Sequence, residues 1–243
     1  MERVEYHRMA VLEATMWWYR ALHAGLIGRL GLPTGARLLD AGCGTGGLLA
    51  RLSAMRPDLQ LTGLEYDAEA AALAREKTGL AVQVGSVNAM PYAEASFDGV
   101  VSADVLCHAG VDQAAALAEL RRVLKPGGRL LLNLPAYQWM ASAHDAHVHN
   151  VRRYTAGGAR SLLQQSGFTA VRSGYWNSLL FPLMLLHRLM ARNGGSEAGS
   201  DVRPFPAWQD RLFFTVTAIE RRLGQWGLSL PFGGSVWVEA RKA

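Results

Sequence analysis

Apolar and polar positions along the chain follow helical and strand periods in turn, and together they predict alternating helices and strands. Residues 2–30 carry apolar side chains at helical spacing, and the Pro-Thr-Gly of residues 33–35 ends that segment. The expected strands that follow span residues 37–40, 60–65, 81–84, 97–102 and 129–134. The expected helices between them span residues 48–55, 68–77 and 113–124.

This alternation predicts an α/β fold with a doubly wound, Rossmann-like parallel sheet, because each crossover must return with right-handed sense. After residue 150 we expect a helix at 156–165, a strand at 169–174 and a final strand at 235–240. The prediction is one domain, residues 1–243, built from four segments. These are an N-terminal helical cap (1–35), a core (36–175), a helical insertion (176–231) and the final strand segment (232–243).

Composition narrows the class of protein. Half of the 243 residues are hydrophobic, which excludes a disordered chain. No run of eighteen apolar residues is free of charge, and the N-terminus resembles neither a secretory nor a transit peptide, so we expect a cytoplasmic protein without a spanning helix. Two cysteines, Cys43 and Cys107, are too few for a disulfide framework or a cysteine-based zinc site.

The net charge of +5 is unevenly distributed along the chain. Residues 1–150 hold 13 Lys and Arg against 15 Asp and Glu, whereas residues 151–243 hold 12 against 5. The arginines are scattered rather than gathered with interleaved aromatic residues, so we do not expect nucleic-acid binding. The positive charge of residues 151–243 could instead bind an anionic substrate or an anionic membrane surface.

A glycine turn joins the first expected strand to its helix. The pattern Gly42-x-Gly44-x-x-Gly47 matches the dinucleotide fingerprint, so an NAD-dependent dehydrogenase is the first candidate. Asp40, at the strand end, would repel a pyrophosphate and attract a ligand with ammonium and sulfonium charges. It therefore favours S-adenosyl-L-methionine (SAM) over NAD. Glu65 stands 19 positions after Gly46, where a carboxylate can accept hydrogen bonds from both ribose hydroxyls.

Six successive segments resemble the signatures of class I SAM-dependent methyltransferases. They are Leu38–Gly46, Gly63–Asp67, Met90–Tyr92, Ser96–Val101, Asp104–His108 and Leu124–Leu130. The aromatic N-terminal segment and a D…H…RRY pattern between residues 145 and 154 are also similar to a bacterial subgroup of that family.

The resemblance implies a seven-stranded sheet of order 3-2-1-4-5-7-6 whose last strand, at residues 235–240, is antiparallel. It also implies a set of cofactor-binding residues. These are Asp40, Ala41, Gly42, Cys43, Gly44, Gly46, Glu65, Tyr66, Ser86, Val87, Asp104 and Val105. The family often has Asp where this chain has Ser86, so adenine recognition here would rest on Ser86 or a backbone group, with Val87 on the adenine face.

Candidate catalytic residues gather in a polar stretch after the fifth strand. They are His144, Asp145, His147 and His149, together with His108 after the fourth strand. One of these histidines could act as a general base, with Asp145 orienting the imidazole, or they could pin the loop to the sheet. A metal site is disfavoured, since the three clustered histidines lack helical i, i+4 spacing.

Two groups of residues are candidates for binding the methyl acceptor. Trp17, Trp18 and Tyr19 form an aromatic cluster on the N-terminal helix, and Tyr137, Arg152, Arg153 and Tyr154 flank the histidines. The arginines could bind an acceptor carboxylate or phosphate, or form salt bridges within the protein.

The leading functional hypothesis is methyl transfer from SAM to an O or N nucleophile of a small-molecule acceptor, with S-adenosyl-L-homocysteine as the product. One alternative is a lipid-linked or glycan acceptor at the membrane surface, and another is a SAM-binding protein without transferase activity. The insertion at 176–231 could cover the acceptor pocket, mediate a homodimer, contact a membrane, or only enlarge the core.

Overall fold

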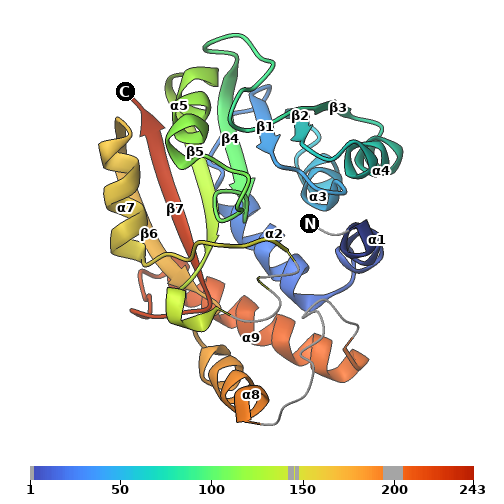
Figure 1. The fold of residues 1–243 in the computed structure, drawn as a ribbon, viewed down its shortest axis with the longest axis vertical. Helices are drawn as coiled ribbons and strands as arrows, with labels where there is room; N and C mark the ends of the chain where they lie inside the picture. The colour runs from blue at the N-terminus through green and yellow to red at the C-terminus, as the bar shows by residue number, and fades with distance from the viewer. Residues whose placement is uncertain (1–2, 142–144, 146–147, 194–204) are drawn as a thin grey trace.

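The computed structural model describes residues 3–141, 145, 148–193 and 205–243, which contain one seven-stranded sheet of order β3-β2-β1-β4-β5-β7-β6 (Figure 1). The strands are β1 (Arg37–Ala41), β2 (Gln60–Glu65), β3 (Ala81–Val84), β4 (Phe97–Ala103), β5 (Leu124–Pro135), β6 (Phe168–Trp176) and β7 (Ser235–Lys242). Strands β1 to β5 pair in parallel, whereas β7 is antiparallel to both β5 and β6. The predicted fold class, strand order and antiparallel last strand are confirmed.

Helices cover both faces of this sheet. They are α1 (Arg3–Leu12), α2 (Trp17–Arg29), α3 (Gly47–Met55), α4 (Ala68–Thr78), α5 (Gln113–Val123), the 3-10 helix η1 (Gln138–Met140), α7 (Ala156–Gln165), α8 (Phe181–Asn193) and α9 (Ala207–Gln225). Neighbouring strand residues belong to different buried clusters: Leu39 packs in the cluster that includes α5 and α7, and Leu38 in the cluster that includes α2 and α3. Strand alternation thus builds a core on each face of the sheet.

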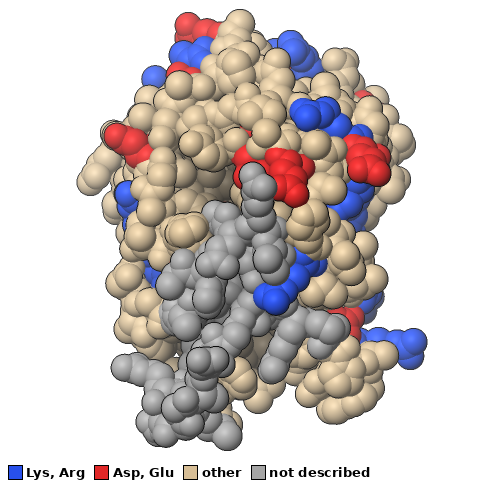
Figure 2. Space-filling model, turned by 45° about the vertical axis from the view of Figure 1, so that its right-hand side comes forward, with Lys and Arg blue, Asp and Glu red and all other residues tan. Residues whose placement is uncertain are grey.

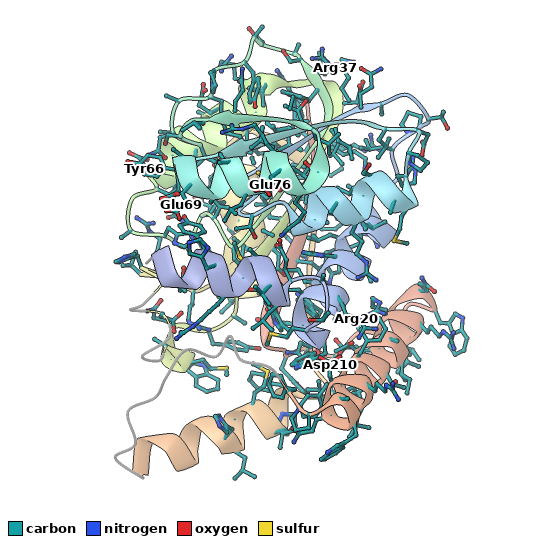
Figure 3. All side chains as sticks on the ribbon, turned by 90° about the vertical axis from the view of Figure 1, so that its right-hand side faces the viewer. Arg20, Arg37, Tyr66, Glu69, Glu76 and Asp210 are labelled. Atoms are coloured by element: carbon teal, nitrogen blue, oxygen red, sulfur yellow. The ribbon has the colours of Figure 1, made fainter. Side chains whose placement is uncertain are left out.

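The N-terminal segment forms two helices rather than the single helix expected over residues 2–30. The backbone N–H of Trp17 donates to Asp210 Oδ1 of α9 at 2.5 Å, and Arg20 Nη1 donates to Asp210 Oδ2 at 3.1 Å (Figure 3). A carboxylate at a helix N-terminus is favourable, because it pairs with unsatisfied N–H groups. A residue nearly two hundred positions away therefore fixes where α2 begins, which the local pattern does not reveal.

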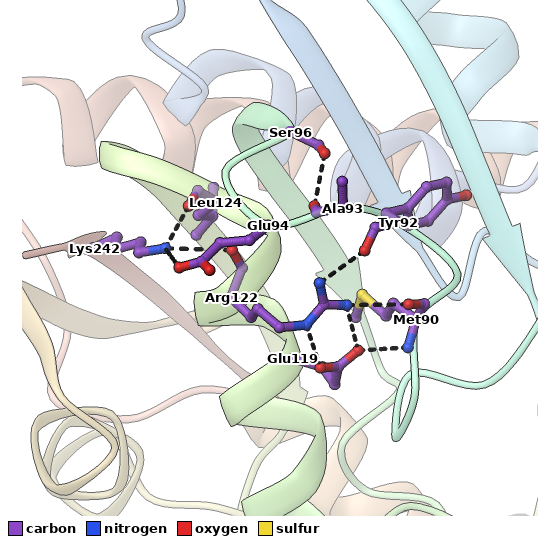
Figure 4. A network of polar contacts seen from close by, with 9 residues as sticks. All are labelled: Met90, Tyr92, Ala93, Glu94, Ser96, Glu119, Arg122, Leu124 and Lys242. Carbon is purple, nitrogen blue, oxygen red and sulfur yellow. Dashed lines mark hydrogen bonds and ion pairs between the residues drawn. The ribbon is translucent and has the colours of Figure 1, made fainter.

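The connection between β3 and β4 is tied to α5 by one arginine and one glutamate (Figure 4). Arg122 donates to the backbone oxygens of Tyr92 at 2.7 Å and Met90 at 3.1 Å, and it pairs with Glu119 at 2.6 Å. Glu119 in turn accepts from the backbone N–H of Met90 at 2.6 Å. These bonds hold the segment that carries Ser86 and Val87 at the carboxyl end of β3.

The segment after β6 contains α8 and α9. Helix α9 lies against α2, where Trp17 packs edge-on against Phe213 with ring centres 5.4 Å apart. In the described part of the chain, no helix combines the length and the hydropathy that a membrane crossing requires.

Candidate functional site

The glycine turn lies between the end of β1 and the start of α3, and two of its glycines cannot be replaced without strain. Gly42 has a φ of +86°, and a Cβ there would overlap the side chain of Val105, which follows β4. Gly46, the N-cap of α3, has a φ of +87°, and a Cβ there would lie 3.0 Å from Ala74 of α4. Both positions combine a left-handed backbone with close packing, so they need glycine.

Three buried carboxylates surround this turn. Asp40, Glu65 and Glu13 are 2%, 7% and 5% exposed. Burial, followed by the charges of Glu65 and Glu13, raises the pKa of Asp40 to about 8. Burial also raises the pKa of Glu65 and of Glu13, against the opposing effect of their hydrogen bonds. Lys77 pairs with Glu13. Such a concentration of acid groups favours a cationic ligand.

Glu65 is held firmly at the carboxyl end of β2. Its Oε2 accepts from the backbone N–H of Gly44 at 2.8 Å and its Oε1 from that of Asp67 at 3.1 Å. The Tyr6 hydroxyl also forms a hydrogen bond with this carboxylate. Its neighbour Tyr66 is 78% exposed. The carboxylate of Glu65 is therefore held by one N–H of the glycine turn, one N–H after β2 and one hydroxyl of α1.

Helix α1 and the residue after it contact the turn, an arrangement that was not predicted from the sequence. Glu13 accepts from Thr45 Oγ1 at 2.8 Å and from the backbone N–H of Gly47 at 3.1 Å. The terminal carbon of Met9 lies 2.8 Å from the position of a Cβ on Gly44. Glu13 was detectable in principle, because it is the only charged residue between Arg8 and Arg20.

The residues expected around an adenine differ in their surroundings. Ser86 follows β3, and its Oγ accepts from the backbone N–H of Asn88 at 3.1 Å. Val87 is buried among the core side chains on the α5 face.

Cys43, within the glycine turn, is also buried, and burial followed by the charge of Asp40 raises the pKa of its thiol.

A second polar network joins the carboxyl ends of β4 and β5. Asn133 Nδ2 donates to both carboxylate oxygens of Asp104, each at 3.0 Å, and Trp176 Nε1 donates to Asn133 Oδ1 at 2.6 Å. Asp104 has a φ of +55°, a backbone conformation that non-glycine residues rarely adopt. Burial raises its pKa to about 7, against the hydrogen bond from Asn133 and the charge of Arg153. A carboxylate with this pKa can exchange a proton near neutral pH.

Sequence reasoning missed Asn133 and Trp176. Asn133 was the better signal of the two, because it is a polar residue inside the apolar run of β5, near its carboxyl end. The Trp176 contact could not be foreseen, since it joins residues 43 positions apart.

The segment that ends at Tyr154 is fastened by its own polar side chains. Arg153 Nη2 donates to both oxygens of Asp145, at 2.8 and 2.9 Å, and the two side chains are 7% and 6% exposed. Arg152 donates to the backbone oxygens of His108 at 2.9 Å and Val111 at 3.1 Å. The Tyr154 hydroxyl donates to Leu106 O at 2.9 Å. Arg153 thus forms a salt bridge within the protein, whereas Arg152 and Tyr154 donate to backbone oxygens.

Two of the four candidate histidines lie within the described residues. His144 and His147 lie outside the described residues. The imidazole of His108 forms hydrogen bonds with backbone groups of Val148 and Asp104, and burial lowers its pKa. His149 has a φ of +56°, and its backbone oxygen accepts from Ala109 N–H at 2.9 Å.

The aromatic candidates separate into two environments. Trp17 is 7% exposed and packs against Phe205 and Phe213, so it belongs to the contact between α2 and α9 rather than to an open pocket. Trp18 lies beside Trp176, with ring centres 6.2 Å apart, and touches Tyr19 edge-on. Trp18 thus connects α2 to the network of Asp104.

Tyr137 stands in a row of stacked rings after β5. Its ring centre lies 5.4 Å from that of Trp139 and 5.3 Å from that of Tyr175. Burial and a hydrogen bond with Tyr175 raise the pKa of Tyr137 to about 12. This row forms an apolar wall near the carboxyl end of β5.

Comparisons with known proteins agree with this arrangement. Residues 39–132 match the model of a methyltransferase domain. The O-methyltransferase cnsE of Penicillium expansum is 31% identical over 155 residues, which are 59% of this chain and 55% of that protein, so the match spans about half of its length. The O-methyltransferase rstn1 of Aspergillus nomiae is 30% identical over 158 residues, 59% of this chain and 68% of that protein.

A solved structure shares the whole fold. It is a SAM-dependent methyltransferase of Thermotoga maritima, described as a possible histamine N-methyltransferase, with a TM-score of 0.62 and 18% identity. The alignment covers 99% of this chain and 96% of that one. The family match, the relatives and the strand order agree: the chain belongs to the class I SAM-dependent methyltransferases.

Proposed function

We propose that this protein transfers a methyl group from SAM to an O or N nucleophile of a small-molecule acceptor, with Asp104 as the general base. The observation that carries the proposal is the pair of acidic sites at neighbouring strand ends. Asp40 and Glu65 lie at the carboxyl ends of β1 and β2, and Asp104 follows β4, next to β1 in the sheet.

The glycine turn suits SAM. Asp40 and Glu65 supply negative charge for a cationic ligand, and Glu65 has the acceptor oxygens that ribose hydroxyls require. Gly42 and Gly46 let Val105 and Ala74 pack directly on the turn, and this packing fixes the shape of its backbone. Ser86 and Val87 follow the neighbouring strand β3 and are our candidates for the adenine. When bound, SAM supplies an electrophilic methyl group on a positively charged sulfur.

Asp104 would remove the proton that the acceptor must lose. Asn133 orients both oxygens of the carboxylate, and Trp176 fixes the orientation of the Asn133 amide. Burial brings the pKa of Asp104 to about 7, so a large part of it is ionised at neutral pH and still holds useful basicity. His108 is a second candidate for this role, because burial keeps its imidazole neutral beside Asp104.

The relatives named as O-methyltransferases support an oxygen nucleophile. The stacked rings of Tyr137, Trp139 and Tyr175 support an acceptor with an apolar or aromatic body. The two alternatives are a lipid-linked or glycan acceptor and a protein that binds SAM without transferring the methyl group.

Turnover of SAM against a pooled metabolite library tests this proposal. We expect S-adenosyl-L-homocysteine to form with at least one pool, and mass spectrometry to show one product heavier by a methylene unit. The matched control is Asp104→Asn, which should bind SAM but release far less product. SAM binding without product from any pool, including pools of lipid-linked and glycan acceptors, would favour the non-catalytic alternative.

A further inference from the structure

The outward side of α9 carries a stripe of large apolar side chains. Trp208, Leu212, Ile219 and Trp226, at the end of the helix, are 66%, 49%, 48% and 77% exposed. Their spacing of four, seven and seven residues places them along one side of a helix. On the opposite side of α9, Phe213 packs against Trp17 of α2 and Thr217 is buried. The core therefore leaves this stripe uncovered.

Two of the three arginines of α9 are exposed on its outer side, whereas Arg221 packs on the inner side against Gly25 of α2 and the ring of Phe214. Both of its carboxylates turn toward the protein: Asp210 binds the start of α2, and Glu220 accepts from the backbone N–H groups of Ser178 at 2.8 Å and Leu179 at 3.2 Å. Arg211 and Arg222 are exposed and flank the apolar stripe. The outer face of the helix thus combines apolar groups with positive charge.

Other large apolar side chains outside α9 are exposed as well. Leu228 and Leu230, in the segment that follows, are 62% and 40% exposed, and Leu183 and Leu186 of α8 are 50% and 55% exposed. Figure 1 shows α8 and α9 at the end of the molecule toward which the arrow of β4 points. The view in Figure 2 shows mostly uncharged surface, with small groups of both signs. Exposed apolar patches of this kind usually mark an interaction site.

We propose that the outer face of α9, formed by Trp208, Leu212, Ile219 and Trp226, docks on the surface of an anionic lipid bilayer. A helix of 19 residues is about 28 Å long and can lie flat in the headgroup region. Tryptophan side chains prefer that region, and arginines beside them pair with lipid phosphates. The inward turn of Asp210 and Glu220 removes the carboxylates that would oppose such contact.

A second copy of the chain fits this face less well. In a two-fold contact the same surface meets itself, so Arg211 and Arg222 of one copy would face the same cations of the other. A bilayer with anionic headgroups presents the complementary charge. Docking needs neither SAM nor an acceptor, so this proposal stands apart from the proposed reaction.

Co-sedimentation with vesicles tests the docking surface. We expect the full chain to bind vesicles of phosphatidylcholine mixed with phosphatidylglycerol, to bind pure phosphatidylcholine weakly, and to lose affinity as salt rises. Leu212→Ser with Ile219→Ser should lower the partition coefficient about tenfold. Arg222→Gln alone should lower it about fivefold.

Matched controls use equally exposed residues elsewhere. Met55→Ser with Val84→Ser removes apolar groups that are 55% and 48% exposed, and Arg160→Gln removes an exposed cation on α7. Both controls should bind like the wild type, and all variants should keep its melting temperature. The proposal would be overturned by no binding of the wild type to anionic vesicles, or by binding that the α9 and control variants reduce equally. A dimer in sedimentation velocity that the Leu212 and Ile219 changes dissociate would also overturn it, by showing a second copy as the occupant.

Discussion

Asn133 donates its side-chain amide to both carboxylate oxygens of Asp104, each at 3.0 Å. The amide oxygen of Asn133 accepts from Trp176 Nε1. A half-turn of the amide would therefore break this bond as well as the bonds to Asp104. The end of β6 therefore fixes the orientation of a carboxylate at the end of β4. This is the arrangement expected of a group that must meet an acceptor in one geometry.

Replacing the carboxylate should separate catalysis from folding. Asp104→Asn should lower kcat by about 10²–10⁴-fold, the usual contribution of a general base, with SAM affinity close to wild type. Asparagine tolerates the left-handed backbone at this position, so the fold should persist. Initial rates and calorimetry check both statements, and an unchanged kcat would exclude Asp104 as the base.

The same variant has a pH-dependent effect on stability. The folded protein raises the pKa of Asp104 from 3.8 to about 7, so the native state holds this proton more tightly than the unfolded chain. Asp104 therefore costs stability as pH rises from about 4 to about 7, and the cost stays constant above that. Asp104→Asn should melt higher than the wild type at pH 8, and this gain should shrink at pH 5. A gain that is equal at both pH values would contradict the assigned pKa.

The pH profile of the reaction should report the Asn133 contact. In the wild type, kcat/KM should rise with pH and level off above about 7, because the base must be ionised. Asn133→Leu removes a hydrogen bond that favours the ionised form, so the inflection should move to higher pH. A purely structural role for Asn133 would lower the rate at every pH and leave the inflection in place.

Asp145 and Arg153 should behave as a buried structural pair. Because each side chain is less than a tenth exposed, Arg153→Ala should cost about 3–5 kcal/mol of unfolding free energy. The double variant with Asp145→Ala should lose less than the sum of the single changes. Arg56 and Asp58 form a matched pair whose side chains are 26% and 27% exposed, and Arg56→Ala should cost about 1 kcal/mol or less. Urea denaturation that gives equal losses at both pairs would contradict this interpretation.

Glu13 should anchor the N-terminal helix to the glycine turn. In Glu13→Gln, the Thr45 hydroxyl and the Gly47 N–H would donate to a neutral amide instead of a carboxylate. This change should lower the unfolding free energy by about 1–3 kcal/mol. Glu76→Gln, on α4, is the control with no effect expected (Figure 3). If both variants have the melting temperature of the wild type, other contacts hold α1 in place.

Sequence patterns were sufficient for the sheet and for the ends of its strands. Short apolar runs between turn residues located the strands, the resemblance to a known family supplied their order, and the acidic residues Asp40 and Glu65 stand at the carboxyl ends of β1 and β2. Contacts between distant side chains were not predictable, since packing brings them together. Asp210 interrupts the N-terminal helix and Glu13 reaches Gly47 for this reason. The sequence left two interpretations of Arg152 and Arg153 open; both side chains bond to groups of the protein, and acceptor binding by them stays a prediction.

The charge of the glycine turn can be tested directly by calorimetric titration of SAM. Burial holds the pKa of Asp40 near 8, and a bound cation would favour its ionised form. The affinity of the wild type should therefore rise up to about tenfold between pH 6 and 7, with proton release, and Asp40→Asn should show a shallower dependence. Glu65→Gln should bind more weakly by about 1–3 kcal/mol, whereas Glu76→Gln, an exposed change on α4, should bind like the wild type. Unchanged affinity in both Asp40→Asn and Glu65→Gln, or tight binding of NAD in place of SAM, would contradict the account.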